Sequence, residues 1–548
     1  MAAAERMDTA QALVAGLIAN GLDTLYALPG VQNDPFFDAL YHAQNRLRVI
    51  HARHEQGSAT MALGAALATG RPQGMCVVPG PGLLNAATAL ATAYSTNARV
   101  LAIVGQIPLH SIGRMTGQLH EVVDQTAILR TLTKWSAVVK APGEVAPLLE
   151  EAFRQMLSGR PRPAGLEVPM DVWRHAAPVH PHRVAEPLPP PPVDEDAAEA
   201  AARLLGAAER PMLVVGSGAA EASEAVREIA EALTAPVLSF RMGRGVLDAR
   251  HPLEVRLPVG HRLWAEADAV LVAGTRAQAP LGGWGLDAGL KVVRVDADAE
   301  EIGRFGRPDL ALHGDAAPIL RAIADRLGRH NCARPGRAEH VAGVKAEVMA
   351  RVASALAPQA AFLDTMRQEL PEDGILVDEL TQVSYAARLL WPVHAPRTFL
   401  SSGMQGTLGW GFGAALGAKA ALPDRPVLSL NGDGGFMFGV QELATAVQHG
   451  IAVVAVVFND GAFGNVRSIQ KQSFGGRVIA SELRNPDFVR LAESFGAQGL
   501  RATGPEELRA ALRRGFATTD VPTLIEVPVG EFPSPWEFVM LPRARPGR

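Results

Sequence analysis

The sequence predicts an α/β protein built from three doubly wound parallel-sheet domains, and three observations support this prediction. Short apolar runs of strand length alternate with helix-like segments along the whole chain. The runs are apolar at nearly every position, as strands are when helices cover both faces of a parallel sheet. The chain has 548 residues, enough for about three to four domains of ordinary size.

Each of the three parts of the chain contains such runs. The proline-rich stretch at 186–196 predicts a stiff, extended linker, and the polar, turn-rich stretch at 328–340 predicts a second boundary. We therefore expect an N-terminal domain over 1–180, a middle domain over 196–330 and a C-terminal domain over 355–535. The predicted strands lie at 48–50, 74–78 and 100–105, then at 211–216, 269–274 and 291–296, and finally at 374–378, 427–430 and 451–460.

Composition excludes several other classes of protein. Hydrophobic residues make up 48% and charged residues 20%, which is typical of globular and not of disordered chains. The formal net charge is −4, so no basic surplus indicates nucleic acid or an anionic membrane as a partner. Two cysteines, Cys76 and Cys332, exclude a disulfide framework and a four-cysteine zinc site.

The sequence also bears on location. No apolar run reaches 18 residues, so no membrane-spanning helix is expected. The N-terminal residues carry acidic side chains and predict a first helix instead of a signal peptide. We therefore expect a cytoplasmic protein.

Two acidic residues stand at the ends of consecutive predicted strands. Asp433 lies in the glycine-rich run 432–435 after one strand, and Asp460 ends the next. Magnesium prefers oxygen ligands and binds through one or two carboxylates together with phosphates. Glycines let backbone N–H groups approach phosphate oxygens closely. A glycine-rich turn with a capping aspartate would explain the first motif alone, but the second acidic strand end favours a metal and phosphate site.

Two further segments are rich in small residues. Glu55 opens a predicted helix, where the helix dipole favours a carboxylate, so a purely structural acid is one interpretation. The stretch 402–423 has a high density of glycine, which tight helix packing would also explain.

The Gly-Asp-Gly motif followed at this distance by an Asn-Asp pair resembles the thiamine diphosphate fingerprint. The similarity extends over the whole chain and is greatest to the acetolactate synthase, pyruvate oxidase and benzoylformate decarboxylase group. This resemblance implies thiamine diphosphate and Mg²⁺ as cofactors. It implies that the C-terminal domain holds the diphosphate, that the N-terminal domain holds the aminopyrimidine of a partner subunit's cofactor, and that the chain forms a homodimer or homotetramer.

The resemblance also assigns roles to individual residues. The Mg²⁺ ligands would be Asp433, the side chain of Asp460, where most members have Asn, and the carbonyl of Ala462. Glu55 would exchange a proton with the aminopyrimidine and so activate the cofactor. Residues implied to contact the cofactor are Asn85, Thr381, Gln382, Gly406, Leu408, Gly432, Asp433, Gly434, Gly435 and Asp460.

His120 occupies a position where acetolactate synthases have a glutamine facing the cofactor. It is either a loop histidine with no part in the chemistry or a proton carrier, since imidazole exchanges a proton near neutral pH. Val31 and Val78 stand where benzoylformate decarboxylase has serine and histidine, which argues against that active site. The middle domain lacks the segments of FAD-binding acetolactate synthases, and its Gly-x-Gly turn at 216–218 lacks a third glycine, so no required FAD is expected.

The sequence therefore predicts an enzyme that cleaves or forms the bond next to the carbonyl of a small 2-oxo acid. An acetolactate-synthase-like carboligase leads, and a simple decarboxylase is the alternative. A flavin or nicotinamide oxidoreductase using the middle domain is a different class, and a yellow purified protein would favour it. A non-catalytic binding protein is a third class, against which Glu55 and Asp433 argue. Neither nucleic acid nor a membrane is an expected partner.

Overall fold

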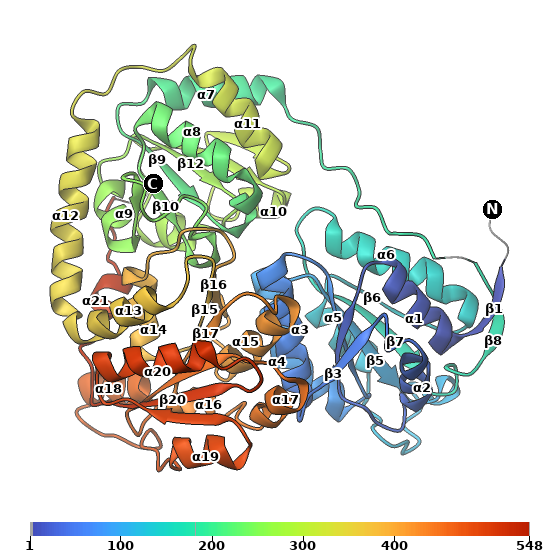
Figure 1. Cartoon of the computed structure of the whole chain (residues 1–548). Coiled ribbons are helices and arrows are strands. Elements are labelled where there is room, and N and C mark those ends of the chain that lie inside the picture. Colours follow the sequence, from blue (N-terminus) through green and yellow to red (C-terminus); the bar gives the residue numbers. More distant parts are fainter. Residues whose placement is uncertain (1–3, 181, 547–548) are drawn as a thin grey trace.

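The computed structural model describes residues 4–180 and 182–546. It contains three six-stranded sheets in which all neighbouring strands are parallel, with helices on both faces of each sheet (Figure 1). The predicted fold class is therefore confirmed. The three sheets lie at the corners of a triangle, with the middle domain above the other two in this view.

The sheet of the N-terminal domain has the strand order β3-β2-β4-β5-β7-β6. Its strands are β2 (Thr24–Ala27), β3 (Arg48–His51), β4 (Gln73–Val77), β5 (Val100–Gln106), β6 (Trp135–Val138) and β7 (Ala164–Pro169). Its helices are α1 (Thr9–Ala19), α2 (Asp34–His42), α3 (Glu55–Thr69), α4 (Pro81–Thr96), α5 (Gln125–Leu132) and α6 (Val145–Leu157). The short strand β1 (Glu5–Asp8) pairs antiparallel with β8 (Ala176–Val179). The predicted first helix thus starts only at Thr9, where Asp8 accepts a hydrogen bond from the Gln11 N–H at 2.7 Å and caps it.

The middle domain follows a linker that has no helix or strand from 182 to 194. Its sheet has the order β11-β10-β9-β12-β13-β14. The strands are β9 (Pro211–Val215), β10 (Val237–Ser239), β11 (Glu254–Val255), β12 (Ala269–Ala273), β13 (Lys291–Asp296) and β14 (Leu310–His313). The helices are α7 (Glu195–Ala207), α8 (Ser223–Leu233), α9 (Leu257–Trp264), α10 (Ala299–Ile302) and α11 (Ala316–Leu327). Central strands β9 and β12 are buried at every position, which explains their continuous apolar sequence.

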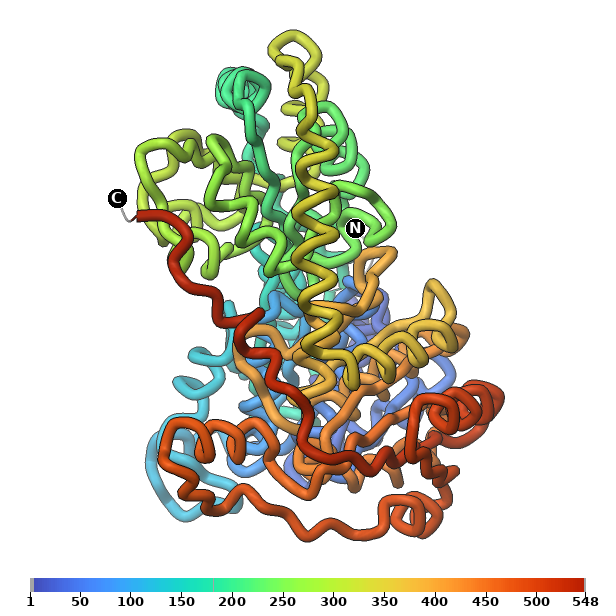
Figure 2. The backbone as a smooth tube through the Cα atoms, turned by 90° about the vertical axis from the view of Figure 1, so that its left-hand side faces the viewer, coloured from blue at the N-terminus to red at the C-terminus, as the bar shows by residue number. Residues whose placement is uncertain are grey.

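The long helix α12 (Arg337–Ala355) connects the middle domain to the C-terminal sheet, and Figure 2 shows it running down from the middle domain. Its first residues fall in the stretch predicted to be a turn-rich boundary. The helix begins there because Arg337 is buried and pairs with Glu266 of the middle domain at 2.8 Å.

The C-terminal sheet has the order β16-β15-β17-β18-β20-β19. The strands are β15 (Ile375–Asp378), β16 (Phe399–Ser401), β17 (Val427–Gly432), β18 (Val454–Asn459), β19 (Gln498–Arg501) and β20 (Thr523–Pro528). The helices are α13 (Ala357–Glu369), α14 (Gln382–Leu390), α15 (Trp410–Ala421), α16 (Asp433–Phe436), α17 (Glu442–His449), α18 (Gly464–Ser473), α19 (Phe488–Ser494), α20 (Pro505–Ala517) and α21 (Trp536–Val539).

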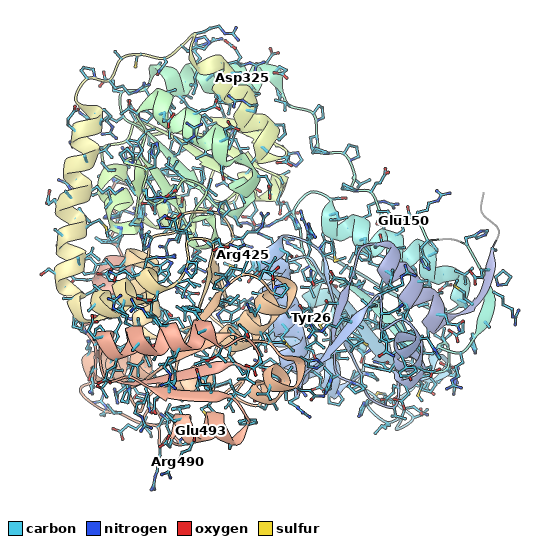
Figure 3. All side chains as sticks on the ribbon, in the orientation of Figure 1. Tyr26, Glu150, Asp325, Arg425, Arg490 and Glu493 are labelled. Atoms are coloured by element: carbon cyan, nitrogen blue, oxygen red, sulfur yellow. The ribbon has the colours of Figure 1, made fainter. Side chains whose placement is uncertain are left out.

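The N-terminal and C-terminal domains meet through helices α3 and α15. A Cβ at Gly64 would overlap the main chain of Ala414, and one at Gly417 would overlap that of Met61. The Tyr26 hydroxyl, which lies beside this contact in Figure 3, donates to the Gly417 carbonyl at 3.3 Å. The small residues of both helices therefore permit backbone-to-backbone packing.

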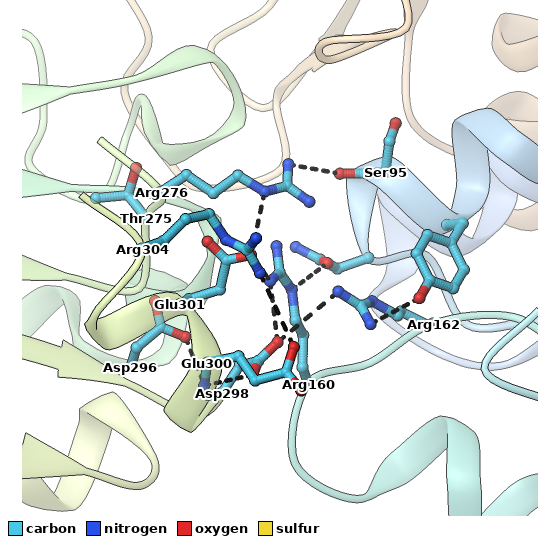
Figure 4. A network of polar contacts seen from close by, with 12 residues as sticks. Ser95, Arg160, Arg162, Thr275, Arg276, Asp296, Asp298, Glu300, Glu301 and Arg304 are labelled. Atoms are coloured by element: carbon cyan, nitrogen blue, oxygen red, sulfur yellow. Dashed lines mark hydrogen bonds and ion pairs between the residues drawn. The ribbon is translucent and has the colours of Figure 1, made fainter. Parts of the chain in front are cut away.

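A network of charged side chains joins the N-terminal and middle domains (Figure 4). Arg160 contacts Glu301 at 2.8 Å and Asp298 at 3.2 Å. Burial alone would raise the pKa of Glu301, but Arg160 and Arg304 lower it. Arg276 donates to the main-chain carbonyl of Ser95 at 3.3 Å. Ion pairs and hydrogen bonds between arginine side chains and acidic or carbonyl groups thus hold the two domains together.

The segment 531–546 returns from the C-terminal domain to the middle domain (Figure 2). At one end, the Trp536 indole N–H donates to Asn465 at 2.6 Å. At the other end, Arg545 is buried, donates to the Trp264 carbonyl at 2.8 Å and pairs with Asp287 at 2.6 Å. This segment therefore fastens the two domains together.

Candidate active site

The two predicted metal-binding carboxylates meet at one edge of the C-terminal sheet. Strands β17 and β18 are neighbours, with Gly432 opposite Phe458. Asp433 directly follows β17, and Asp460 directly follows β18. Ligand sites in such sheets lie beyond the carboxyl ends of the strands, which is where both side chains lie.

Asp433 is almost fully buried, with 2% of its surface exposed. It accepts a hydrogen bond from the Asn485 side chain at 2.5 Å, and the N–H groups of Gly434 and Ala462 also stabilise its charge. Burial nevertheless raises its pKa. Burial, and then the negative charge of Asp433, raise the pKa of Asp460 to about 6, although Arg467 at 3.1 Å opposes this.

This pair of carboxylates fits a divalent cation. Each disfavours the charge of the other, and a cation between them would compensate both. In the described ranges 4–180 and 182–546, no group of three or more His, Cys, Asp or Glu residues forms a metal site. Two carboxylates with main-chain oxygen, such as that of the buried Ala462, and phosphate oxygen from a ligand make the coordination typical of Mg²⁺.

Asn485 is a functional candidate that the sequence did not reveal. Its amide donates to both Asp433 and Asn459, at 2.5 and 2.9 Å, and so ties the ends of β17 and β18 together. It is separated from Asp433 by 52 residues, in the segment before α19, with no motif around it. Only the folded chain brings it to the site.

The predicted diphosphate loop lies at the same edge. Thr381 is the N-cap residue of α14, and a Cβ at Gly432 would lie 3.3 Å from the Thr381 Cβ. A Cβ at Gly464 would lie 2.7 Å from the Gln382 amide nitrogen and would also crowd Asp460. The structure thus gathers Thr381, Gln382 and both acids around one cradle lined by glycine.

On the N-terminal domain, Glu55 is the first residue of α3. Its Oε2 accepts a hydrogen bond from the Asn85 amide of α4 at 2.9 Å. His54 is the N-cap residue and accepts from the Gln56 N–H at 3.1 Å. The structure therefore brings together the two predicted pyrimidine-side residues Glu55 and Asn85.

The C-terminal domain supports the turn before Glu55 through Glu442, which the sequence did not single out. Glu442 is 1% exposed and accepts from the Arg53 N–H at 3.1 Å and from the Thr445 hydroxyl at 2.6 Å. A Cβ at Gly57 would overlap its carboxylate. The position of Glu55 thus depends on a side chain from another domain.

The loop before α15 carries the other predicted cofactor contacts. Gly406 has φ +58°, and a Cβ there would lie 3.7 Å from Leu380. Leu408 is half-buried. The Thr407 and Thr92 hydroxyls share a hydrogen bond of 2.7 Å, which holds the loop against α4.

His120 lies in an exposed loop of the N-terminal domain in an uncommon conformation. Its φ is +68°, in the left-handed region that is unfavourable for a residue with a Cβ. Its Nδ1 is buried without a hydrogen-bond partner. The main chain of His120 closes over Gly80, where a Cβ would overlap its carbonyl. Strain of this kind is frequent at functional sites.

The residues form two separate sets in one chain. Throughout the part of the chain that the structure describes, no hydrogen bond or ion pair joins Glu55, Asn85 or His120 to Asp433, Asp460 or Gln382. The two sets lie in different domains, the first in the N-terminal and the second in the C-terminal domain.

Family models match all three domains. Residues 7–128 match the thiamine pyrophosphate enzyme N-terminal TPP binding domain, 198–323 the central domain and 380–527 the C-terminal TPP binding domain. The chain is 36% identical to "Probable 2-ketoarginine decarboxylase AruI" of Pseudomonas aeruginosa, over 94% of this chain and 93% of that protein. It is 31% identical to "Probable acetolactate synthase large subunit" of Methanocaldococcus jannaschii, over 95% and 92%. It is also 31% identical to "Acetolactate synthase large subunit" of Corynebacterium glutamicum, over 98% and 89%.

In residues 4–180 and 182–546, every helix is too short or too polar to cross a bilayer.

Proposed function

Because the chain belongs to the thiamine pyrophosphate enzyme family, we propose that it uses thiamine diphosphate and Mg²⁺ to decarboxylate a 2-oxo acid and join the remaining acyl group to a second carbonyl compound. The carboxylate pair of the buried Asp433 and the partly buried Asp460, beside a glycine cradle at the end of the C-terminal sheet, carries this proposal. The relatives named acetolactate synthase support the carboligation step.

The bound cofactor would supply a carbon nucleophile and an electron sink. Asp433, Asp460 and the carbonyl of Ala462 would hold Mg²⁺, and Asn485 would orient Asp433. Thr381 and Gln382 would contact the diphosphate. Glu55 would move a proton to and from N1′ of the aminopyrimidine, with Asn85 orienting its carboxylate.

Simple decarboxylation is the second candidate, in which a proton and not a second carbonyl compound completes the reaction. Two observations favour it. The relative at 36% identity is named a decarboxylase, and His120 offers a buried, unpartnered imidazole nitrogen.

Incubation of the pure enzyme with a panel of 2-oxo acids, with and without aldehyde acceptors, distinguishes the two candidate functions by CO₂ release and product analysis. If no 2-oxo acid yields CO₂, both are wrong.

The oxidoreductase alternative depends on the middle domain. A Cβ at Gly216 or Gly218 would overlap the main chain around Gly274, so close packing of strand ends accounts for this turn. We therefore propose that no flavin is required, and the absorbance spectrum of the purified protein tests this.

We predict an obligate dimer as the active form, because the resemblance to thiamine diphosphate enzymes implies that the Glu55 side of the site and the Asp433 side meet across two chains. Large apolar side chains close in sequence to the two sets of predicted site residues are exposed, among them Leu119 at 64% and Phe438 at 52%. A second copy would cover such surfaces. Light scattering combined with activity measurement should show a dimer or a dimer-based tetramer, and an active monomer would contradict the prediction.

We predict that replacing His120 with Gln lowers aldehyde formation by about 10²-fold or more, the scale of general acid catalysis. Glutamine donates and accepts hydrogen bonds but cannot act as a general acid near neutral pH, so the carboligation share of the products should rise. His110→Gln, an exposed histidine of the same domain, serves as the control. A wild-type product ratio in the His120→Gln variant would show that His120 has no part in the chemistry.

A further inference from the structure

Glu379 is a buried carboxylic acid to which the proposed chemistry gives no role. It directly follows β15, and its side chain is fully buried. Its Oε1 accepts a hydrogen bond from the Gly409 N–H at 2.5 Å, and its Oε2 accepts one from the Gly411 N–H at 3.3 Å. The side chain thus joins the end of β15 to the start of α15.

These two N–H groups belong to the N-terminus of α15. The first N–H groups of a helix have no partner within the helix. Gly409 is the N-cap residue and has no side chain that could accept from them. Glu379 supplies the missing acceptor from a distant part of the chain, and the helix dipole favours an acceptor at this end.

The opposite side of Glu379 faces the Gly-Asp-Gly-Gly motif. A Cβ at Gly435 would lie 2.8 Å from the Glu379 Oε1, and a Cβ at Gly411 would lie 2.9 Å from the Glu379 Cβ. The carboxyl group therefore fills the space between the motif and α15, and both glycines are needed for this contact. The loop that carries Gly406 and Leu408 leads directly into the capped turn.

Among the residues that the structure describes, no cationic side chain forms an ion pair with this carboxyl group. Burial raises the pKa of Glu379 to about 8, and the negative charge of Asp378 adds to this rise. The hydrogen bonds from the two N–H groups lower the pKa but do not outweigh burial. Asp378 itself pairs with Arg388 at 2.7 Å. Gly409, Gly411 and Gly435 border the carboxyl group and carry no charge, and Tyr385 of α14, whose pKa burial raises, lies near enough for the charge of Glu379 to raise that pKa further.

We propose that Glu379 is a positioning residue that holds the loop of Gly406 and Leu408 against the Gly-Asp-Gly-Gly motif, in the geometry that lets one thiamine diphosphate contact both. This inference rests on the proposed function, because the cofactor is what the loop and the motif would share. Ionisation of Glu379 would place an uncompensated negative charge between them, close to where the diphosphate would bind.

The first test measures thiamine diphosphate binding by calorimetry, in the presence of Mg²⁺, between pH 7 and 9. For the wild type, affinity should fall about tenfold for each pH unit above 8, since binding favours the form that retains the proton. Glu379→Gln cannot ionise and keeps one acceptor oxygen, which can bind the Gly409 N–H, so its affinity at pH 7 should stay within about threefold of the wild type and should not decline in this range. An equal decline in the wild type and in Glu379→Gln would overturn the proposal.

A matched control replaces another buried carboxylate. Glu254 of the middle domain is 4% exposed and pairs with Arg256 at 2.8 Å. Glu254→Gln should retain the wild-type decline with pH. If it abolished the decline as well, the effect would belong to buried carboxylates in general, and the role given to Glu379 would be wrong.

The second test needs no cofactor. Hydrogen–deuterium exchange of the apoprotein over residues 402–412 should be the same in the wild type and in Glu379→Gln, and about tenfold faster in Glu379→Ala, which removes the cap. Unchanged exchange in Glu379→Ala would overturn the capping role. If the wild type bound no thiamine diphosphate at any pH, the proposed function would fail, and the exchange result would still decide whether Glu379 fixes the loop.

Discussion

Replacement of Glu55 with Gln should slow turnover by about 10²- to 10⁴-fold, the range for loss of general acid–base catalysis. Glutamine has the same size and can still interact with the Asn85 amide that now donates to Glu55 at 2.9 Å. It cannot exchange a proton with the aminopyrimidine. Exchange of the C2 proton of the bound cofactor, followed by NMR, should slow by a similar factor, whereas calorimetry should show little change in cofactor affinity.

The control for this variant is Glu150→Gln, a substitution in the same domain at the surface helix α6 (Figure 3). It should leave both C2 exchange and turnover unchanged. A Glu55→Gln enzyme with wild-type C2 exchange would exclude Glu55 from cofactor activation, whatever its turnover.

Replacement of Asp433 with Ala should abolish retention of thiamine diphosphate and Mg²⁺ while the fold persists. The apoprotein should remain folded because removing Asp433 relieves its repulsion of Asp460, whose pKa it helps to raise to about 6. Loss of a carboxylate ligand leaves the cation too few protein oxygens. Calorimetry measures the lost binding, and circular dichroism measures the retained fold.

Two further variants sharpen this prediction. Asp520→Ala, at an exposed position of the same domain, should bind the cofactor as the wild type does. Asp460→Asn keeps an oxygen ligand and should also retain the cofactor. Wild-type affinity in Asp433→Ala would show that the metal lies elsewhere.

The fold class followed from the sequence because a parallel sheet covered on both faces requires nearly continuous apolar strands. β9 and β12 are buried at every position and are apolar along their whole length. The start of α12 was missed because Arg337 reads as a polar boundary residue, and only its ion pair with Glu266 explains its burial. The predicted domain limits remain predictions from linker composition.

The candidate site was only partly predictable. Asp433 and Asp460 stand next to strand ends, so local sequence points to them. Asn485 and Glu442 act across distant segments, and nothing in their local sequence indicates their partners. The glycines of the segment 402–423 also serve two purposes, since Gly406 and Gly409 have positive φ angles whereas Gly417 permits helix packing.

The returning segment 531–546 has a consequence for recombination between relatives of this protein. The polypeptide visits the middle domain twice, first as its sheet and later through Arg545, which binds the carbonyls of Trp264 and Ala267. A chimera with breakpoints only at the two linkers would combine a foreign middle domain with the native arginine anchor. A chimera that exchanges the middle domain therefore needs three junctions, one at each linker and one before residue 531. The segment 531–546 should come from the same parent as the middle domain to which it binds.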